Sequence, residues 1–184
     1  MNRTITVALM LLVGVQAAYA QKAVKMKYSG SNVATTINLQ DGTVTDEELL
    51  AGHGPLGAFT YRELHADTNN PQASSTCSTG PYFPVVTGAG VFRFEDGSLM
   101  TVNVTGGGIC VDFATLLGHL TEKYTITGGT GRFQHATGTL ALTGTLNVVL
   151  SDASGNPKLL TNAGEFQGTV LGVAAPEEGQ AERQ

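Results

Sequence analysis

The stretch Tyr124–Leu142 reads YTITGGTGRFQHATGTLAL, and three of its glycines lie within four residues, at Gly128, Gly129 and Gly131. A glycine-rich loop beside a cation such as Arg132 can hold a phosphate group. Such a loop needs a Lys-Ser/Thr pair after its glycines and a helix that begins at the anion. Here a phenylalanine follows the arginine, and strand-like alternation flanks the stretch on both sides. We therefore predict that the three glycines form a structural turn, because glycine accepts positive φ without a Cβ clash.

The first twenty residues have the pattern of a secretory signal peptide. A positive start precedes an apolar run from Ile5 to Val15, and Ala18-Tyr19-Ala20 fits the small-x-small cleavage pattern. We predict that residues 1–20 are removed, that the mature chain starts at Gln21, and that the protein is secreted or periplasmic. Since no later apolar run approaches about 18 residues, no membrane span is expected in the mature protein.

Length and composition favour one domain built from short strands. The chain has 184 residues, 24 of them glycine, with 14% charged residues and a formal net charge of −5. This acidic balance gives no indication of the basic face that nucleic-acid binding requires, so no nucleic-acid partner is expected. We assign residues 21–173 to the folded domain. The tail at 174–184 lacks apolar periodicity and is predicted to be disordered.

Two cysteines, Cys77 and Cys110, remain in the predicted mature chain. In an exported protein an even pair is most simply a disulfide. Closing this loop would be worth roughly 3–4 kcal/mol on the chain-entropy account. Buried free thiols and a reactive thiol are the alternatives. A zinc site is disfavoured because two cysteines supply half a ligand set and no histidine lies at ligand spacing.

Alternating segments and turn signals predict an all-β fold. The Asp96-Gly97 pair between two alternating segments is the strongest hairpin signal. The spacing of the segments is typical of a barrel or a sandwich. One exception is Thr45-Asp46-Glu47-Glu48, whose capping-box form predicts a single helical turn at 46–50.

The glycine stretch also carries a family resemblance. Thr127–Phe133 followed by Ala136-Thr137-Gly138 resembles a motif of the allene oxide cyclase and dirigent barrels, and it is most similar to exported bacterial members. The resemblance covers about residues 30–172 and implies an eight-stranded antiparallel β-barrel with an apolar cavity. Plant members cyclise a fatty-acid epoxide or guide the radical coupling of phenols, and they are often oligomeric, which raises a homo-oligomer as a partner. None of their catalytic residues is matched onto this chain, so its catalytic residues are unknown.

Strand parity nominates residues for the barrel interior, because side chains alternate between the two faces of a strand. Glu63 shares a face with Phe59 and Tyr61, and Glu122 shares one with Tyr124. A two-residue hairpin at Asp96-Gly97 would place Arg93 on an inward face. We therefore predict that a ligand cavity is lined by Tyr61, Glu63, Arg93, Glu122 and Tyr124. The alternative is that the three charged side chains are solvated on the outer wall.

Three function classes follow from these observations. The protein binds a small apolar ligand in its barrel without catalysis, acts as a cyclase or isomerase on a lipid or terpenoid, or is mainly structural. The four histidines show no metal-ligand spacing. Neither a metal nor a cofactor is therefore expected.

Overall fold

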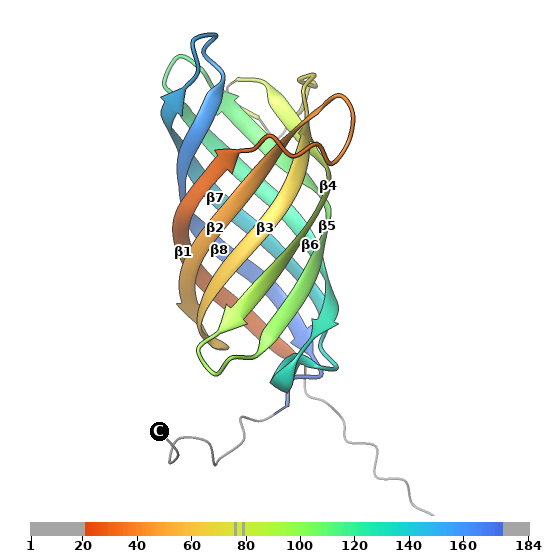
Figure 1. Ribbon diagram of the computed structural model, residues 1–184. Helices are drawn as coiled ribbons and strands as arrows, with labels where there is room; N and C mark the ends of the chain where they lie inside the picture. Colours follow the sequence, from red (N-terminus) through yellow and green to blue (C-terminus); the bar gives the residue numbers. More distant parts are fainter. Residues whose placement is uncertain (1–20, 76, 79, 175–184) are drawn as a thin grey trace, which may run out of the picture.

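The computed structural model describes residues 21–75, 77–78 and 80–174. Eight antiparallel strands close into one barrel in sequence order, with β1 pairing with β8 (Figure 1). The strands are β1 (Lys22–Ala34), β2 (Thr43–Gly54), β3 (Gly57–Thr68), β4 (Tyr82–Phe94), β5 (Leu99–Asp112), β6 (Leu117–Gly129), β7 (Thr137–Ser151) and β8 (Pro157–Leu171). The predicted all-β, eight-stranded antiparallel barrel is confirmed.

Two predictions about the chain ends stay predictions. The signal peptide expected at 1–20 lies outside the described residues, as does all but the first residue of the tail expected at 174–184. Among the residues that the structure describes, no helix has the length and apolar character needed to cross a bilayer.

The strands form where the sequence alternates, and the alternation decides what the barrel encloses. In β6 the buried residues are Gly118, Leu120, Glu122, Tyr124 and Ile126, and the residues between them are exposed up to Thr127. Burying one face of each strand against the other seven removes apolar side chains from water. Closure also removes the unpaired sheet edges.

The helical turn predicted at 46–50 is wrong, because this segment lies within β2. The ladder between β2 and β3 runs from Thr43↔Thr68 to Gly54↔Gly57 around a turn at Pro55-Leu56. Thr45, expected to cap the helix, instead accepts a hydrogen bond at Oγ1 from the Leu39 N–H, 3.2 Å away. A continuous ladder along the strand outweighs one local capping bond.

The glycine-rich stretch closes one end of the barrel. Gly128 and Gly131 have φ of 129° and 57°, and the chain turns there from β6 into a short 3-10 helix, η1 (Gly131–Phe133). Phe133 is fully buried and stacks on Phe94 with ring centroids 4.6 Å apart. The Arg132 Nε lies 2.7 Å from Asp96 Oδ2, so this guanidinium is paired within the fold.

The predicted disulfide is confirmed. Cys77 and Cys110 are bonded, with their Cα atoms 5.6 Å apart. The bond fixes the long β3–β4 connection to the end of β5, at the open end of the barrel (Figure 1).

Candidate functional site

The barrel interior changes from aromatic to polar along a single strand. From the closed end toward the mouth, the inward-facing residues of β3 are Phe59, Tyr61, Glu63, His65 and Asp67. Successive members are two residues apart, so each lies about 6.6 Å farther along the strand. The two aromatic side chains pack with Phe92 and Phe166. The three charged side chains lie between this aromatic layer and the mouth.

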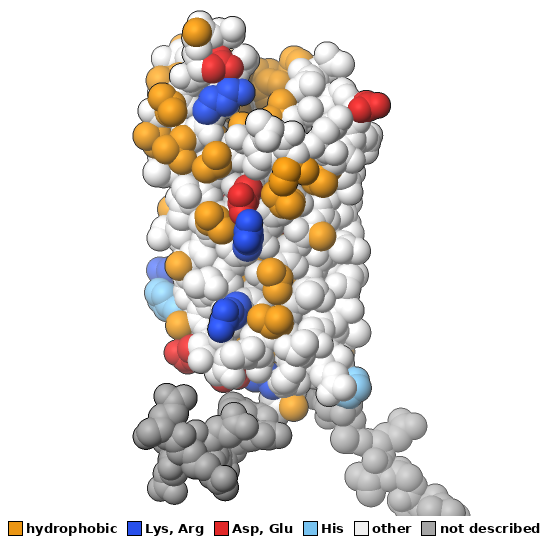
Figure 2. Space-filling view, in the orientation of Figure 1, with side chains coloured by type: hydrophobic (Ala, Val, Ile, Leu, Met, Phe, Trp, Pro, Cys, Tyr) orange, Lys and Arg blue, Asp and Glu red, His pale blue; other side chains and the backbone are white. Residues whose placement is uncertain are grey.

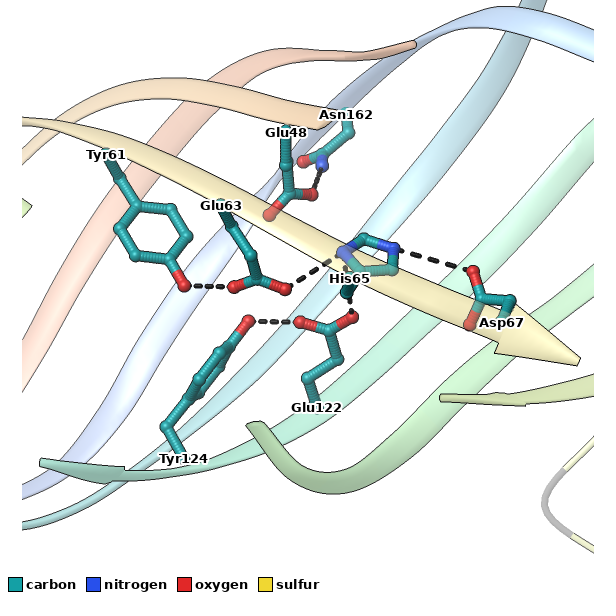
Figure 3. Close-up of polar contacts among 8 residues, drawn as sticks. All are labelled: Glu48, Tyr61, Glu63, His65, Asp67, Glu122, Tyr124 and Asn162. Carbon is teal, nitrogen blue, oxygen red and sulfur yellow. Dashed lines mark hydrogen bonds and ion pairs between the residues drawn. The ribbon is translucent and has the colours of Figure 1, made fainter. Parts of the chain in front are cut away.

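Neighbouring strands bring further polar side chains to the same level. The β2–β3 register pairs Asp46 with His65 and Glu48 with Glu63. Glu122 enters from β6 and Asn162 from β8 (Figure 3). We call Asp46, Glu48, Glu63, His65, Asp67, Glu122 and Asn162 the polar cluster; each is at most 9% exposed.

Hydrogen bonds organise the polar cluster around His65 (Figure 3). His65 Nδ1 lies 2.9 Å from Glu63 Oε1 and 3.9 Å from Glu122 Oε1. Tyr61 donates its hydroxyl proton to Glu63, and Tyr124 donates its own to Glu122. Each carboxyl group thus joins an aromatic side chain below it to the imidazole above.

Asn162 donates from Nδ2 to Glu48. Several buried polar atoms have no hydrogen-bond partner within the structure. They include Glu48 Oε2, Glu122 Oε1, His65 Nε2 and Asp67 Oδ1. The polar cluster therefore has capacity to bind a proton, an ion or the polar end of a ligand.

The ionisable side chains of the polar cluster are almost all acidic. The polar cluster holds five carboxyl groups and one histidine, and no Lys or Arg is among the buried residues of the described chain. Burial raises the pKa of Glu48 to about 8, with Glu63 adding to the effect. Burial likewise raises the pKa of Glu122 well above its usual value. Protons therefore neutralise part of this charge at neutral pH.

The pKa of His65 is raised, whereas burial alone would lower the pKa of a histidine. Burial opposes its charged form, but the carboxylates of Glu122, Asp67 and Glu63 outweigh burial and raise its pKa well above the ordinary value. Burial also raises the pKa of Asp46, to about 6. The arrangement thus holds exchangeable protons on both an acid and a base of the same cluster.

A cavity of about 310 Å³ lies above the polar cluster, at the open end of the barrel. Asp46 and Asp67 border it, and so do Asn32 and Lys158. Its apolar lining residues are Val44, Phe83, Ile109, Val111, Phe113, Pro157 and Leu160, and the polar side chains of Thr68, Asn69 and Asn156 complete the wall. We call this space the mouth cavity. It combines a partly apolar wall with carboxyl groups at its floor.

The rim around the mouth cavity is also apolar. Exposed apolar side chains on the connections and strand ends at this level are Ile37, Leu39, Phe113, Leu116, Val149 and Leu150. Figure 2 shows more apolar side chains toward this end of the visible face than toward the closed end. Exposed apolar surface beside a cavity is typical of a site that receives an apolar partner.

A glycine of β4 lies beside the His65 side chain. A Cβ added at Gly88 of β4 would be 2.7 Å from both the His65 Cβ and the Val104 Cγ2. Only glycine leaves room for the His65 side chain at this position. Gly88 therefore allows His65 to lie at the centre of the polar cluster.

Four of the five residues predicted for the interior do face inward. Tyr61, Glu63, Glu122 and Tyr124 are each 1% exposed. They lie below the mouth cavity and do not line it, so their role in ligand binding stays a prediction.

The placement of Arg93 inside the barrel is wrong. Its side chain is exposed on the outer wall, because Arg93 pairs with Leu99 and not with Met100. The turn has four residues between Phe94 and Leu99, where the Phe94 N–H bonds to the Ser98 carbonyl. A register shift of one residue moves every side chain of the strand to the other face.

Sequence reasoning missed Asp46, Glu48, Asp67 and Asn162, and it gave His65 no role. The interpretation of residues 46–50 as helical hid the first two. The tight turn at Pro55-Leu56 was the available signal, because residues equally far from it face each other across β2 and β3. Asn162 comes from a distant strand that only barrel closure brings near.

Two sets of side chains place potential metal-ligand atoms within 4.8 Å of one another. One is Asp46, His65 and Asp67, and the other is Glu63, His65 and Glu122. His65 belongs to both sets: its Nδ1 lies near Glu63 and Glu122, and its Nε2 lies near Asp67. The expectation that the protein has no metal or cofactor remains a prediction from the sequence.

Comparison with known proteins gave no relatives: no family model, no curated protein and no solved structure matches the chain.

Proposed function

We propose that this protein is an exported β-barrel that binds a small, largely apolar molecule in the mouth cavity. The observation that carries the proposal is the mouth cavity itself, about 310 Å³ of space with an apolar wall and carboxyl groups at its floor. Ligand sites commonly combine apolar walls with a few placed polar groups, and this volume lies at the small end of their range.

The position of the carboxyl groups supports a defined orientation of the ligand. Asp46 and Asp67 border the cavity from adjacent strands, while Phe83, Ile109 and Leu160 contribute apolar wall. An apolar body would pack against the wall, and a hydroxyl or amine would donate to a floor carboxylate. The apolar rim extends this surface to the outside and favours capture of apolar molecules from solution.

A blocking substitution tests the proposal. Val44 borders the cavity and is 39% exposed, so a tryptophan at this position can be accommodated without preventing folding, and its side chain would fill the cavity. We expect Val44→Trp to weaken binding of an uncharged fluorescent apolar probe at least 10-fold. The matched control is Leu49→Trp, at an exposed outer-wall position that belongs neither to the cavity lining nor to the rim.

Native mass spectrometry of the exported protein provides the second arm. A co-purified small molecule that is lost on Val44→Trp but retained on Leu49→Trp would support the proposal. Equal probe binding by both variants and by the unaltered protein would contradict it, and would favour a mainly structural role.

A catalytic role is the second candidate, and the position of Asp46 favours it. This carboxyl group faces the cavity and has a pKa of about 6, which suits a general acid or base near neutral pH. Membership of the allene oxide cyclase barrels, proposed from the glycine stretch, would fit a cyclase or isomerase. Turnover of the co-purified molecule, abolished by Asp46→Asn while binding persists, would establish catalysis.

Export is proposed on two observations. The sequence at 1–20 has the signal-peptide pattern, and the disulfide between Cys77 and Cys110 fits an oxidising compartment. N-terminal sequencing of protein recovered outside the cytoplasm should give Gln21. Recovery of chains that retain Met1, or recovery from the cytoplasm alone, would contradict this proposal.

A further inference from the structure

The two nitrogens of the fully buried His65 ring have different surroundings. Nδ1 lies 2.9 Å from Glu63 Oε1, a normal hydrogen-bond distance. Nε2 has no hydrogen-bond partner within the described chain, and its ion-pair distance to Asp67 Oδ2 is 3.4 Å. A charge-assisted hydrogen bond would be about 2.7–2.9 Å. A buried ring nitrogen without a partner is costly, so this atom points to something that binds there.

The atoms around Nε2 have the spacing of a metal-ligand set. Oxygen atoms of Asp46 and Asp67 and a nitrogen of His65 all lie within 4.8 Å of one another. Ligands held about 2.0–2.2 Å from a tetrahedral ion are about 3.4 Å apart. The observed 3.4 Å between Nε2 and Asp67 Oδ2 meets this spacing. Asp67 Oδ1 also lacks a hydrogen-bond partner.

The other side of the ring is already arranged as metal-binding histidines require. A histidine that ligates through one nitrogen commonly donates its other N–H to a carboxylate, which fixes the ring. Glu63 is placed to accept that proton from Nδ1, and Tyr61 donates to the second oxygen of Glu63. This chain of contacts leaves Nε2 facing Asp67 Oδ2.

We propose that His65 Nε2, Asp46 and Asp67 bind a divalent first-row transition-metal ion of the Zn²⁺ type at the floor of the mouth cavity. One histidine and two carboxylates suit such an ion, and three protein ligands leave a coordination position for water or a ligand. The ion also offsets negative charge in an interior where buried Lys and Arg are absent from the described residues.

The second set, Glu63, His65 and Glu122, is a weaker candidate. Its ring nitrogen Nδ1 already has Glu63 as a hydrogen-bond partner, both glutamates are 1% exposed, and neither borders the mouth cavity. Asp46 and Asp67 border the mouth cavity, so an ion can reach them. Access from solvent is a requirement for a site that must load after folding.

The metal site stands independently of the proposed ligand, because metal binding is measured without any organic molecule. The chain from Gln21 is treated with chelator, desalted and titrated with Zn²⁺ by calorimetry, and with Co²⁺ by visible absorption. We expect saturable binding of one ion, a low-coordinate Co²⁺ spectrum, and a rise in Tm on adding Zn²⁺.

Variants assign the site. Asp67→Asn and Asp46→Asn keep the side-chain shape and should each weaken Zn²⁺ binding at least 10-fold and remove the rise in Tm. Glu63→Gln tests the positioning contact and should weaken binding about 10–100-fold without changing the number of ions bound. The controls are His53→Gln, an exposed histidine, and Glu47→Gln, the outward-facing neighbour of Asp46; both should bind as the unaltered protein does.

Two outcomes would overturn the metal site. In the first, the unaltered protein binds no Zn²⁺, and His65 is then a protonated partner of its carboxylates. In the second, the unaltered protein binds Zn²⁺ no more tightly than the Asp46→Asn variant does. Should Asp67→Asn fail to fold, Asp46→Asn at the cavity edge gives the same comparison. Probe binding in the mouth cavity without Zn²⁺ binding would count against the metal alone, and Zn²⁺ binding without probe binding against the organic ligand alone.

Discussion

At the residue scale, the buried carboxyl group of Glu48 makes the free energy of unfolding depend on pH. Burial and Glu63 raise its pKa from 4.5 to about 8, so the folded state holds a proton that the unfolded chain releases. The free energy of unfolding therefore falls as pH rises between these two values, because the native state binds more protons there. The contribution is fully present below about pH 4.5 and is lost by about pH 8.

We predict that Glu48→Gln makes the metal-free protein more stable at pH 9 by up to roughly 5 kcal/mol, with little gain at pH 5. Glutamine keeps an oxygen for the Asn162 amide and cannot ionise. Urea denaturation at pH 5, 7 and 9 measures the effect. Glu165→Gln, at a partly exposed position on the outer wall beside Lys25, should leave the slope between pH 5 and 9 unchanged. A parallel loss of stability with pH in Glu48→Gln and the unaltered protein would refute the assignment.

At the element scale, strand register decided which sequence-based predictions were correct. Parity within β3 and β6 placed Glu63 and Glu122 inside without knowledge of their partners, because a strand's two faces alternate whatever it pairs with. The prediction for Arg93 was wrong because it depended on the assumed length of the turn at Asp96-Gly97. Asp46 and His65 meet only through the β2–β3 register. A single sequence therefore indicated the fold and two of the seven residues of the polar cluster, but not the contacts between strands.

The short helix η1 gives a prediction about the closed end. Phe133 is fully buried and packs on Phe94, so Phe133→Ala should lower the free energy of unfolding by about 3–5 kcal/mol. Guanidinium denaturation is the measurement, and Gln134→Ala at the adjacent exposed position is the control. If both variants unfold at the same denaturant concentration as the unaltered protein, η1 does not seal the barrel as described.

At the scale of the whole molecule, the barrel is divided along its axis. Aromatic packing fills the closed end, ionisable groups occupy the middle, and the mouth cavity opens beyond them. The packed end supplies apolar burial that offsets the unfavourable burial of the carboxyl groups above it. The disulfide joins the long β3–β4 connection to the open end, where packing is least complete.

We predict that replacing both Cys77 and Cys110 by serine lowers the free energy of unfolding by roughly 3–4 kcal/mol, through the loop of 33-residue separation that it closes. Far-UV circular dichroism should stay unchanged at low denaturant, since the strands do not depend on the bond. Reduction of the unaltered protein should reproduce the loss. An undiminished unfolding free energy in the double variant would show that the bond does not constrain the unfolded chain.

Both ends of the described chain leave the barrel on the side of η1. Lys22 pairs with Val170, and the Ala174 N–H bonds to the Arg132 carbonyl. Anything attached at either end therefore stands a full barrel length from the mouth (Figure 1). A reporter domain, an affinity handle or a sensor surface can be joined at both ends at once, and the mouth will still face outward, so this barrel is suited to immobilised capture assays.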